Sequence, residues 1–297
     1  MEKYHRRTLL RTAVAAAAWQ AGAQTPAPGR MRLGIILGLA PDADTAIRHV
    51  QELGFPTCQV SVRETGDAAA SSLRAALDRY RVEATSAVST GPGPEVYDFY
   101  RGPLTIGLVP RQYRQARIAR MKEISDFAKK AGIPAVQGHC GFIPENPNDE
   151  LYQETVAAIR TVAAYCRNNG QNFRCETGQE TPITLVRAIR DVGLDNVGVN
   201  FDVANLILYG KANPVDALDI LGPLVQGVHA KDGLYPTGPR ELGREVPIGQ
   251  GKVNFPAFIK RLKEVGYRGP LTIEREISGA KQVEDIRASK AYLENLL

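Results

Sequence analysis

Four ionisable side chains occupy the same kind of position in this sequence, near the carboxyl end of a short apolar run. They are Glu176, Asp202, His229 and Glu274, in the runs that begin at Asn172, Asn196, Val225 and Pro270. If these runs are neighbouring parallel strands, their carboxyl ends open at one mouth and the four side chains converge there. Three carboxylates in a poorly solvated site repel one another strongly unless a cation lies between them. The pattern therefore predicts one shared divalent metal ion.

The donor set narrows the identity of that ion. Oxygen ligands with one imidazole suit manganese, magnesium, cobalt or iron better than an ion that prefers thiolates, while zinc stays open. We expect manganese. Taken singly, a carboxylate at a strand end can cap a helix, and a histidine in a strand is often a core residue. Four acceptors at the same level of successive strands favour a metal site over these structural roles.

The elements that must position these residues alternate along the chain. Eight short β-rich runs, with amphipathic segments between them, predict repeated βα units and a parallel sheet. The runs begin at Leu33, Thr57, Val82, Pro134, Asn172, Asn196, Val225 and Pro270. The sequence lacks both the G-x-G-x-x-G turn and the G-x-x-x-x-G-K-[ST] loop, which disfavours a doubly wound nucleotide-binding sheet. We therefore expect an α/β protein with a single (β/α)8 TIM barrel over residues 31–297.

The helices and loops of this barrel can be placed from the same pattern. Apolar residues at three- and four-residue steps predict helices over 42–53, 111–131, 150–169 and 255–265. Several predicted helices end in a glycine, which accepts the left-handed C-terminal conformation: Gly54, Gly132, Gly193 and Gly266. Two long connections, 89–111 and 235–255, follow the third and seventh runs, so both are expected over the carboxyl mouth, where loops usually serve the active site.

The first 23 residues read as an export signal. Arg6 and Arg7 precede a short alanine-rich apolar stretch that ends in Ala21-Gly22-Ala23, which resembles a twin-arginine signal peptide with its cleavage site. Residues 24–30 then form a short linker. The apolar stretch is shorter than the roughly 20 residues that span a bilayer. The segment therefore predicts a periplasmic or otherwise exported protein with no stable membrane association after cleavage.

Composition excludes several other classes of protein. The chain of 297 residues is 43% hydrophobic and 23% charged, which is typical of a globular protein. Its net charge is +5, but the predicted signal peptide accounts for +3, so no basic footprint for nucleic acid is expected. The cysteines show no C-x-x-C spacing and are expected to be buried thiols, with a disulfide left open. They are Cys58, Cys140, Cys166 and Cys175.

Several segments resemble a known family. ETGQET at Glu176, NFDVANLILYG at Asn200, VHAKDG at Val228 and GPLTIEREI at Gly269, with VPIGQGKVNFPAFIKRLKEVGY at Val246, are similar to the xylose isomerase-like sugar phosphate isomerase/epimerase barrels. The resemblance implies a TIM barrel that binds one divalent metal ion through Glu176, Asp202, His229 and Glu274. In the ketose 3-epimerases of this family, the two metal-binding glutamates also donate and accept the proton. Glu176 and Glu274 match those positions and are the predicted catalytic residues.

The function expected from these residues is a metal-dependent isomerase or epimerase. It would act on a sugar or keto-sugar by proton transfer through an enediolate held on a divalent metal. A lyase that cleaves a keto-glycoside or dehydrates a sugar derivative by β-elimination is the alternative, and a non-catalytic sugar-binding protein is a third hypothesis. The resemblance to the related abasic-site nucleases implies a cluster of three metal ions with many more histidines. Only three histidines follow the predicted signal here, His49, His139 and His229, so a nuclease of this kind is not expected.

Four further residues are predicted to contact a carbohydrate substrate: His139, Glu180, Asn205 and Lys231. Asn205 stands where the resemblance implies a substrate-binding histidine, and the arginine expected shortly after the metal histidine is missing. This departure weighs against a free ketose as substrate. Of the neighbours Lys231 and Asp232, one is expected to position the substrate and the other to hold a loop. Arg275 and Glu276 are predicted to pair structurally. A homo-oligomer is left open.

Overall fold

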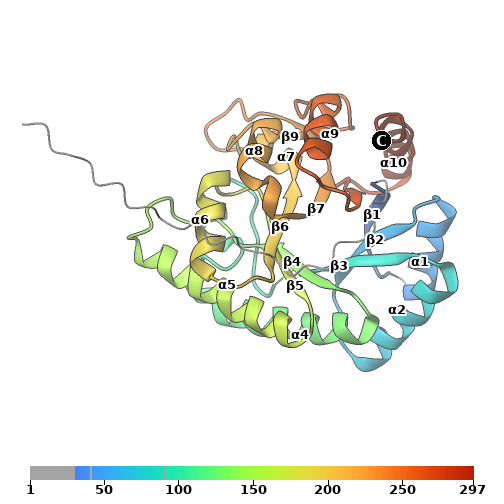
Figure 1. Ribbon diagram of the computed structural model, residues 1–297, viewed down its shortest axis with the longest axis horizontal. Coiled ribbons are helices and arrows are strands. Elements are labelled where there is room, and N and C mark those ends of the chain that lie inside the picture. Colours follow the sequence, from blue (N-terminus) through green and yellow to red (C-terminus); the bar gives the residue numbers. More distant parts are fainter. Residues whose placement is uncertain (1–30, 41, 90) are drawn as a thin grey trace, which may run out of the picture.

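The computed structural model describes residues 31–40, 42–89 and 91–297. The predicted signal peptide and linker, residues 1–30, lie outside this range. Eight parallel strands form a closed barrel in the order β1-β10-β7-β6-β5-β4-β3-β2 (Figure 1). Their bounds are β1 Leu33–Gly38, β2 Thr57–Val62, β3 Glu83–Ser89, β4 Ala135–His139, β5 Asn172–Glu176, β6 Val197–Asp202, β7 Val225–Ala230 and β10 Leu271–Ile273. The single (β/α)8 barrel and all eight predicted strands are confirmed.

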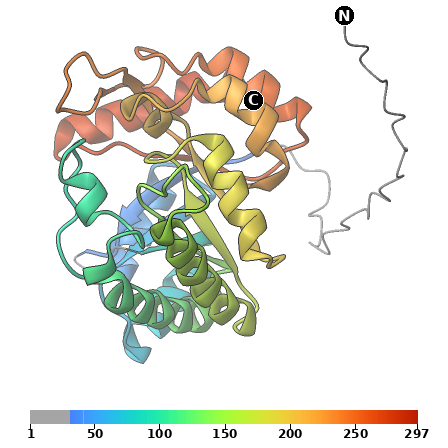
Figure 2. The ribbon, with the colours of Figure 1, turned by 90° about the vertical axis from the view of Figure 1, so that its left-hand side faces the viewer.

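Helices follow the strands and surround the barrel (Figures 1 and 2). Asp42 begins α1 by accepting the Thr45 N–H at 2.8 Å, and the predicted glycines Gly132 and Gly193 end α4 and α6 with φ values of 76° and 70°. The helices are α1 Ala43–Glu52, α2 Asp67–Tyr80, α3 Gly102–Thr105, α4 Arg111–Ala131, α5 Glu150–Asn168, α6 Pro182–Val192, α7 Val203–Leu208, α8 Pro214–Leu221, α9 Phe255–Glu264 and α10 Ala280–Glu294. Within the described part of the chain, no helix has the length and apolar character needed to cross a membrane.

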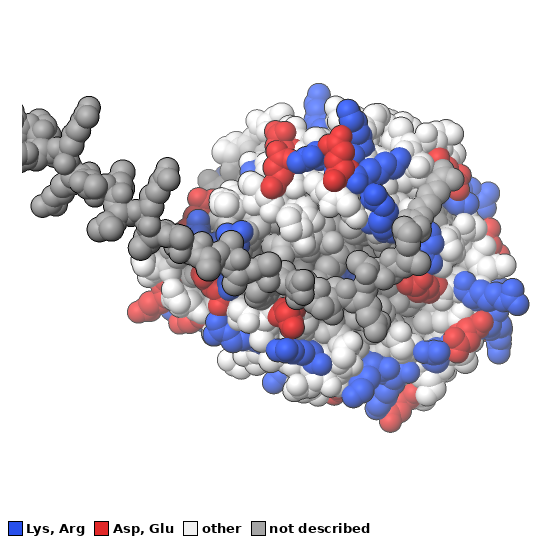
Figure 3. Space-filling view, in the orientation of Figure 1, with Lys and Arg blue, Asp and Glu red and all other residues white. Residues whose placement is uncertain are grey.

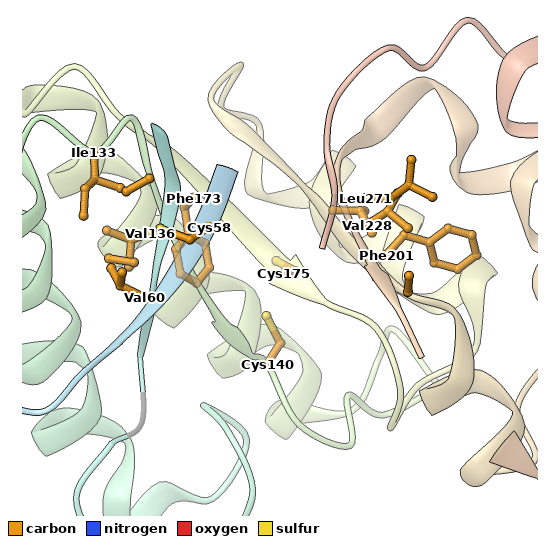
Figure 4. Close-up of a cluster of buried hydrophobic side chains, with 14 of the residues drawn as sticks. Cys58, Val60, Ile133, Val136, Cys140, Phe173, Cys175, Phe201, Val228 and Leu271 are labelled. Carbon is orange, nitrogen blue, oxygen red and sulfur yellow. The ribbon is translucent and has the colours of Figure 1, made fainter. Parts of the chain in front are cut away.

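Two layers with different chemistry flank the strands. Apolar side chains such as Val60, Val136 and Phe173 are buried (Figure 4), and they belong to one continuous cluster with the buried faces of the helices. The alternate strand residues are polar and point into the barrel. A hydrogen bond of 3.3 Å from Gln59 on β2 to Asn200 on β6 joins two strands that are not neighbours, so it must cross the interior. The apolar core therefore lies between the strands and the helices, and the interior of the barrel is polar.

All four cysteines are free and buried, as expected. Cys140 and Cys175 lie near each other where β4 and β5 end (Figure 4). Burial raises the pKa of the Cys58 thiol to about 12 and that of Cys166 to about 11. These thiols are therefore protonated packing groups.

The two long connections meet over the carboxyl mouth. The Phe99 N–H donates to the Arg240 carbonyl at 3.2 Å, and the Arg240 guanidinium lies 4.6 Å from the centre of the Tyr100 ring. Each connection also carries an element that the sequence did not predict: α3 in the first and β9 Arg244–Val246 in the second. Strand β9 pairs antiparallel with the equally unpredicted β8 Asp232–Leu234, which directly precedes the second connection. Segments of three or four residues are too short to show a hydrophobic period.

Charged side chains are mixed over the face shown in Figure 3, where acidic and basic groups alternate with uncharged residues. The described part of the chain also forms exposed ion pairs, such as Arg32 with Glu83 at 2.6 Å and Arg261 with Asp219 at 2.6 Å. Exposed pairs of this kind add little stability because water screens them. The charges that bear on function lie instead at the mouth of the barrel.

Candidate metal centre and its pocket

The four predicted metal ligands converge at the carboxyl mouth. Each of Glu176, Asp202, His229 and Glu274 offers a ligand atom within 4.8 Å of the others. The Nδ1 atom of His229 lies 3.3 Å from Glu176 Oε1, 3.5 Å from Asp202 Oδ2 and 3.1 Å from Glu274 Oε2. The strand register sets this level, because Asp202 pairs directly with His229 across β6 and β7. The quartet could hold a metal ion.

A second layer of polar residues orients His229. Its Nε2 lies 2.7 Å from Gln59 Oε1, so Nε2 carries the hydrogen and Nδ1 faces the carboxylates. Gln59 is held in turn by the Gln137 amide, which donates to the same Oε1 at 2.9 Å, and Gln137 accepts from Ser86 at 2.6 Å. This chain of contacts crosses the barrel interior and fixes the imidazole before any ligand arrives.

The site contains polar atoms that the protein itself does not satisfy. His229 Nδ1 and Asp202 Oδ2 are buried and have no hydrogen-bond partner. Buried polar atoms are rarely left in this state, because an unmade hydrogen bond costs roughly 1–3 kcal/mol. A divalent cation among one imidazole nitrogen and three carboxylates would satisfy both atoms and offset the negative charge. The residues present therefore fit the predicted metal.

The pKa shifts within the quartet also indicate that this site stabilises positive charge. Burial raises the pKa of Asp202 to about 6. Burial alone would lower the pKa of His229, but Glu274 and Glu176 outweigh it and hold this pKa well above its usual value. Burial likewise opposes ionisation of Glu274, yet Lys231 and His229 keep its pKa well below the usual range. A proton on His229 can therefore offset part of the charge that a cation would otherwise neutralise.

A cavity of about 430 Å³ opens above the quartet. Only Glu176 and Glu274 of the four ligands line it, while Asp202 and His229 lie beneath with no exposed surface. The other lining residues are Ile36, Ser61, Val88, Ser89, Glu95, Tyr97, Gly138, His139, Asn205, Leu208, Tyr209, Lys231, Leu242, Gly243, Glu245 and Glu276. A small molecule in this cavity can therefore touch the two glutamates directly.

Three of the four predicted substrate-binding residues line this cavity. His139 Nε2 lies 3.9 Å from Glu176 Oε1, and Asn205 accepts from Lys231 at 3.4 Å. Glu180 differs, because it is not among the lining residues. It is buried, neither of its oxygens has a partner, and burial raises its pKa to about 8. Its side chain is therefore a buried carboxyl group that does not reach the cavity surface in this structure.

The neighbours Lys231 and Asp232 divide the two expected tasks. Asp232 accepts four backbone hydrogen bonds of 2.9–3.2 Å, from the N–H groups of Gly233, Gly249, Gly251 and Val253. It therefore holds the loop before α9, while Lys231 faces the cavity.

Arg275 and Glu276 have different partners. Arg275 pairs with Glu245 and Asp285, each at 2.9 Å, which is a structural role as predicted. Glu276 instead pairs with Lys231 at 2.6 Å at the cavity wall. The expectation of a purely structural pair does not describe Glu276, because the chain turns it toward the mouth after β10.

Some residues of the site carried no recognisable signal in the sequence. Gln59 is one of three polar residues on the largely buried strand β2, and its contact with His229 spans 170 positions of chain. Tyr97 and Tyr209 line the cavity from the first long connection and from the end of α7. The length of the connection predicted that it would cover the mouth, but no pattern singled out Tyr97.

Comparison with known proteins adds to this geometry. The family model described as "Xylose isomerase-like TIM barrel" matches residues 47–296. Among curated proteins, the uncharacterised protein MJ1311 of Methanocaldococcus jannaschii is 29% identical over 196 residues. That match covers 62% of this chain and 63% of MJ1311, so it spans less than two thirds of the relative.

Two solved structures extend the comparison. A xylose isomerase domain protein from Planctomyces limnophilus is 36% identical, with a TM-score of 0.85 over 90% of this chain and 97% of that chain. A D-psicose 3-epimerase, solved in the presence of D-fructose, is 20% identical with a TM-score of 0.69, over 90% of this chain and 99% of that chain. The second likeness shows the fold alone.

Proposed function

The chain belongs to the xylose isomerase-like TIM barrel family, and from that premise we propose that it is a metal-dependent isomerase or epimerase of a sugar or keto-sugar. One observation carries the proposal. Glu176 and Glu274 are the two members of the quartet that also line the cavity. A ligand of the metal centre can therefore meet a carboxylate from β5 and another from the end of β10.

This arrangement suits proton transfer next to a ketone. A divalent cation bound by the quartet would supply a Lewis acid that stabilises negative charge on neighbouring substrate oxygens. One glutamate removes the proton from the carbon beside the ketone, and the other returns a proton from the opposite face. Both carboxyls are held with low pKa values, Glu176 against its own burial by His139 and His229, so either can be the ionised base. The glutamate that returns a proton must first take one up from water, which reaches both side chains through the cavity.

Manganese is the cation that we propose for the site, with magnesium, cobalt, iron and zinc as alternatives. Three carboxylates and one imidazole form a set of hard and intermediate donors, and none of the four ligands is a thiolate. Elemental analysis of protein purified without added metal should find about one divalent ion per chain.

We also propose that the protein is exported through a twin-arginine signal. The support lies in Arg6-Arg7, the short apolar stretch after them and the Ala21-Gly22-Ala23 ending. This route carries folded proteins, so the barrel would acquire its metal before export. Lysine at both Arg6 and Arg7 should leave the protein in the cytoplasm, and normal export of that variant would refute the proposal.

The function itself can be tested by hydrogen exchange. The manganese-loaded protein is incubated in D₂O with a panel of ketoses, keto-glycosides and their reduced controls, and NMR follows deuterium at the carbon beside the ketone. An epimerase incorporates deuterium and inverts that carbon, whereas the lyase alternative incorporates deuterium and releases an unsaturated product. No exchange into any member of the panel would refute both reactions.

A further inference from the structure

The cavity wall is strongly acidic. Its lining glutamates are Glu95, Glu176, Glu245, Glu274 and Glu276, whereas Lys231 is the one lysine or arginine among the described lining residues. Arg275 lies behind the wall and is paired with Glu245 and Asp285, so it offers no free charge to the cavity. A bound divalent cation would leave this balance still negative, because the five carboxylates outnumber the combined positive charge of Lys231 and the ion.

The ammonium group of Lys231 is already fully engaged. It lies 2.6 Å from Glu276 Oε2, 3.2 Å from Glu274 Oε2 and 3.7 Å from Asp202 Oδ2, and it donates to Asn205 Oδ1 at 3.4 Å. An ammonium has three hydrogens to donate, so no donor is left for an incoming anion. Glu276 makes the shortest of these contacts, and its side chain is 57% exposed at the mouth. Its carboxylate can therefore be neutralised without burying an unpaired charge.

Neutral polar atoms, by contrast, are free on the same wall. Ser89 Oγ and Tyr209 Oη are buried, line the cavity and have no hydrogen-bond partner. Burial raises the pKa of Tyr209, so its hydroxyl stays neutral and can donate or accept. Hydroxyl groups of a sugar satisfy such atoms without bringing a charge.

We propose that Glu276 is a specificity-determining residue: by occupying Lys231 it keeps the pocket selective for uncharged polyhydroxy ketones and against sugar phosphates and sugar acids. The inference rests on the proposed function and names the substrate class of the same site. The physical reason is like-charge repulsion, because an anionic substrate meets several carboxylates and must displace Glu276 to reach the lysine. Neutralising Glu276 should free Lys231 for that anion.

The test compares two probes on the manganese-loaded full-length protein. D-Fructose and D-fructose 6-phosphate serve as probes that differ only in the charged phosphate ester, and not as the expected substrate, because Asn205 weighs against a free ketose. Both are titrated, and their binding is measured from the relaxation of water protons at Mn²⁺. We expect the wild-type protein to bind the phosphate ester about ten-fold more weakly than the neutral ketose. Glu276→Gln should narrow this gap by about five-fold or more, mainly through tighter binding of the ester. Glu276→Ala should give the same change.

Glu241→Gln is the matched control. Glu241 is exposed in the neighbouring loop and does not line the cavity, so this variant removes the same charge without touching Lys231. The proposal is overturned if the ester binds the wild-type protein as tightly as fructose, if fructose does not bind, or if Glu276→Gln and Glu241→Gln have equal effects. Selective binding without hydrogen exchange would instead retain the charge selectivity and refute the proposed reaction.

Discussion

The metal centre has a floor and a rim that differ in their surroundings. The floor consists of Asp202 and His229, which have no exposed surface, and His229 is held from beneath by the Gln59 amide. The rim consists of Glu176 and Glu274, which face the cavity. Ligands with the same task toward the metal thus differ in their access to a substrate. This difference predicts that the floor decides whether an ion is held, while the rim decides what happens to a substrate above it.

The largest effect, a loss of metal affinity, should come from removing a ligand of the floor. His229→Ala removes the one nitrogen ligand and leaves three carboxylates, two of them buried, facing one another. We expect metal affinity to fall by about 100-fold or more, since a direct ligand matters at least as much as the outer residues that orient it. Elemental analysis after dialysis, together with a titration of Mn²⁺, measures the loss.

His49→Ala provides the control for that experiment. His49 lies exposed on α1, so its removal changes the histidine count without touching the site. If His229→Ala retains one tightly bound ion per chain, the floor does not hold the metal and the comparison fails.

Breaking the rim should leave metal bound but stop the chemistry. Glu176→Gln and Glu274→Gln each keep one acceptor oxygen and remove the base. Turnover in the exchange assay should fall by about 100-fold or more, a typical cost of losing a general base. Metal content is measured beside the rate, so that a lost ion is not mistaken for a lost base.

The two rim variants also distinguish the reactions. In an epimerase both should block net inversion, and any residual exchange should occur from one face only. In a lyase one variant should lose exchange, while the other keeps exchange and loses product. Near-normal turnover of both metal-loaded variants would assign the rim glutamates a purely structural role.

A smaller loss of metal affinity is expected from a change at Gln59, which supports His229 from beneath. Gln59→Leu removes the acceptor of the His229 Nε2 hydrogen, so the imidazole loses its fixed orientation. Outer-layer partners of this kind typically contribute about 10- to 100-fold in metal affinity. The measurement is a Mn²⁺ titration, with Gln51→Leu on the exposed side of α1 as the control. Equal affinities for the two variants would show that the quartet orients itself.

The smallest effect should come from pH. Asp202 has a pKa of about 6, and the pKa of His229 is raised well above its usual value, so protons compete with the metal for both groups. Affinity should therefore rise with pH, by about ten-fold between roughly pH 6 and pH 8, with protons released on binding. Calorimetry in buffers of different ionisation enthalpy counts those protons, and a pH-independent affinity without proton release would contradict this picture.

The sequence predicted the floor and the rim because both depend on local patterns. Each ligand ends an apolar run, and the run marks a strand whose carboxyl end must open at the mouth. The support was not predictable in this way. Gln59 contacts His229 only because the sheet closes into a barrel, which lets a side chain of β2 reach one of β7 through the interior.

The pairs at the mouth were hidden for a different reason. Lys231 reaches Glu276 because β7 and β10 are neighbours and the chain bends after Ile273, and no periodicity records such a bend. Glu180 illustrates the converse. Its spacing from Glu176 suggested a substrate contact, whereas in the structure Glu180 is buried and is not among the residues that line the cavity, so the contact stays a prediction.

The loop that Asp232 holds has a consequence for anion recognition. Successive backbone N–H groups in a glycine-bearing turn form a nest, a concavity that often captures phosphate. Here the donors are alternate residues, but their N–H groups converge in a similar way, and the Asp232 carboxylate accepts those of Gly249 and Gly251 through one oxygen. A side chain at Gly251 would place its Cβ 2.0 Å from Asp232 Oδ1, so the fit requires glycine. The backbone N–H groups that could bind an anion at this loop are therefore already occupied by the Asp232 carboxylate.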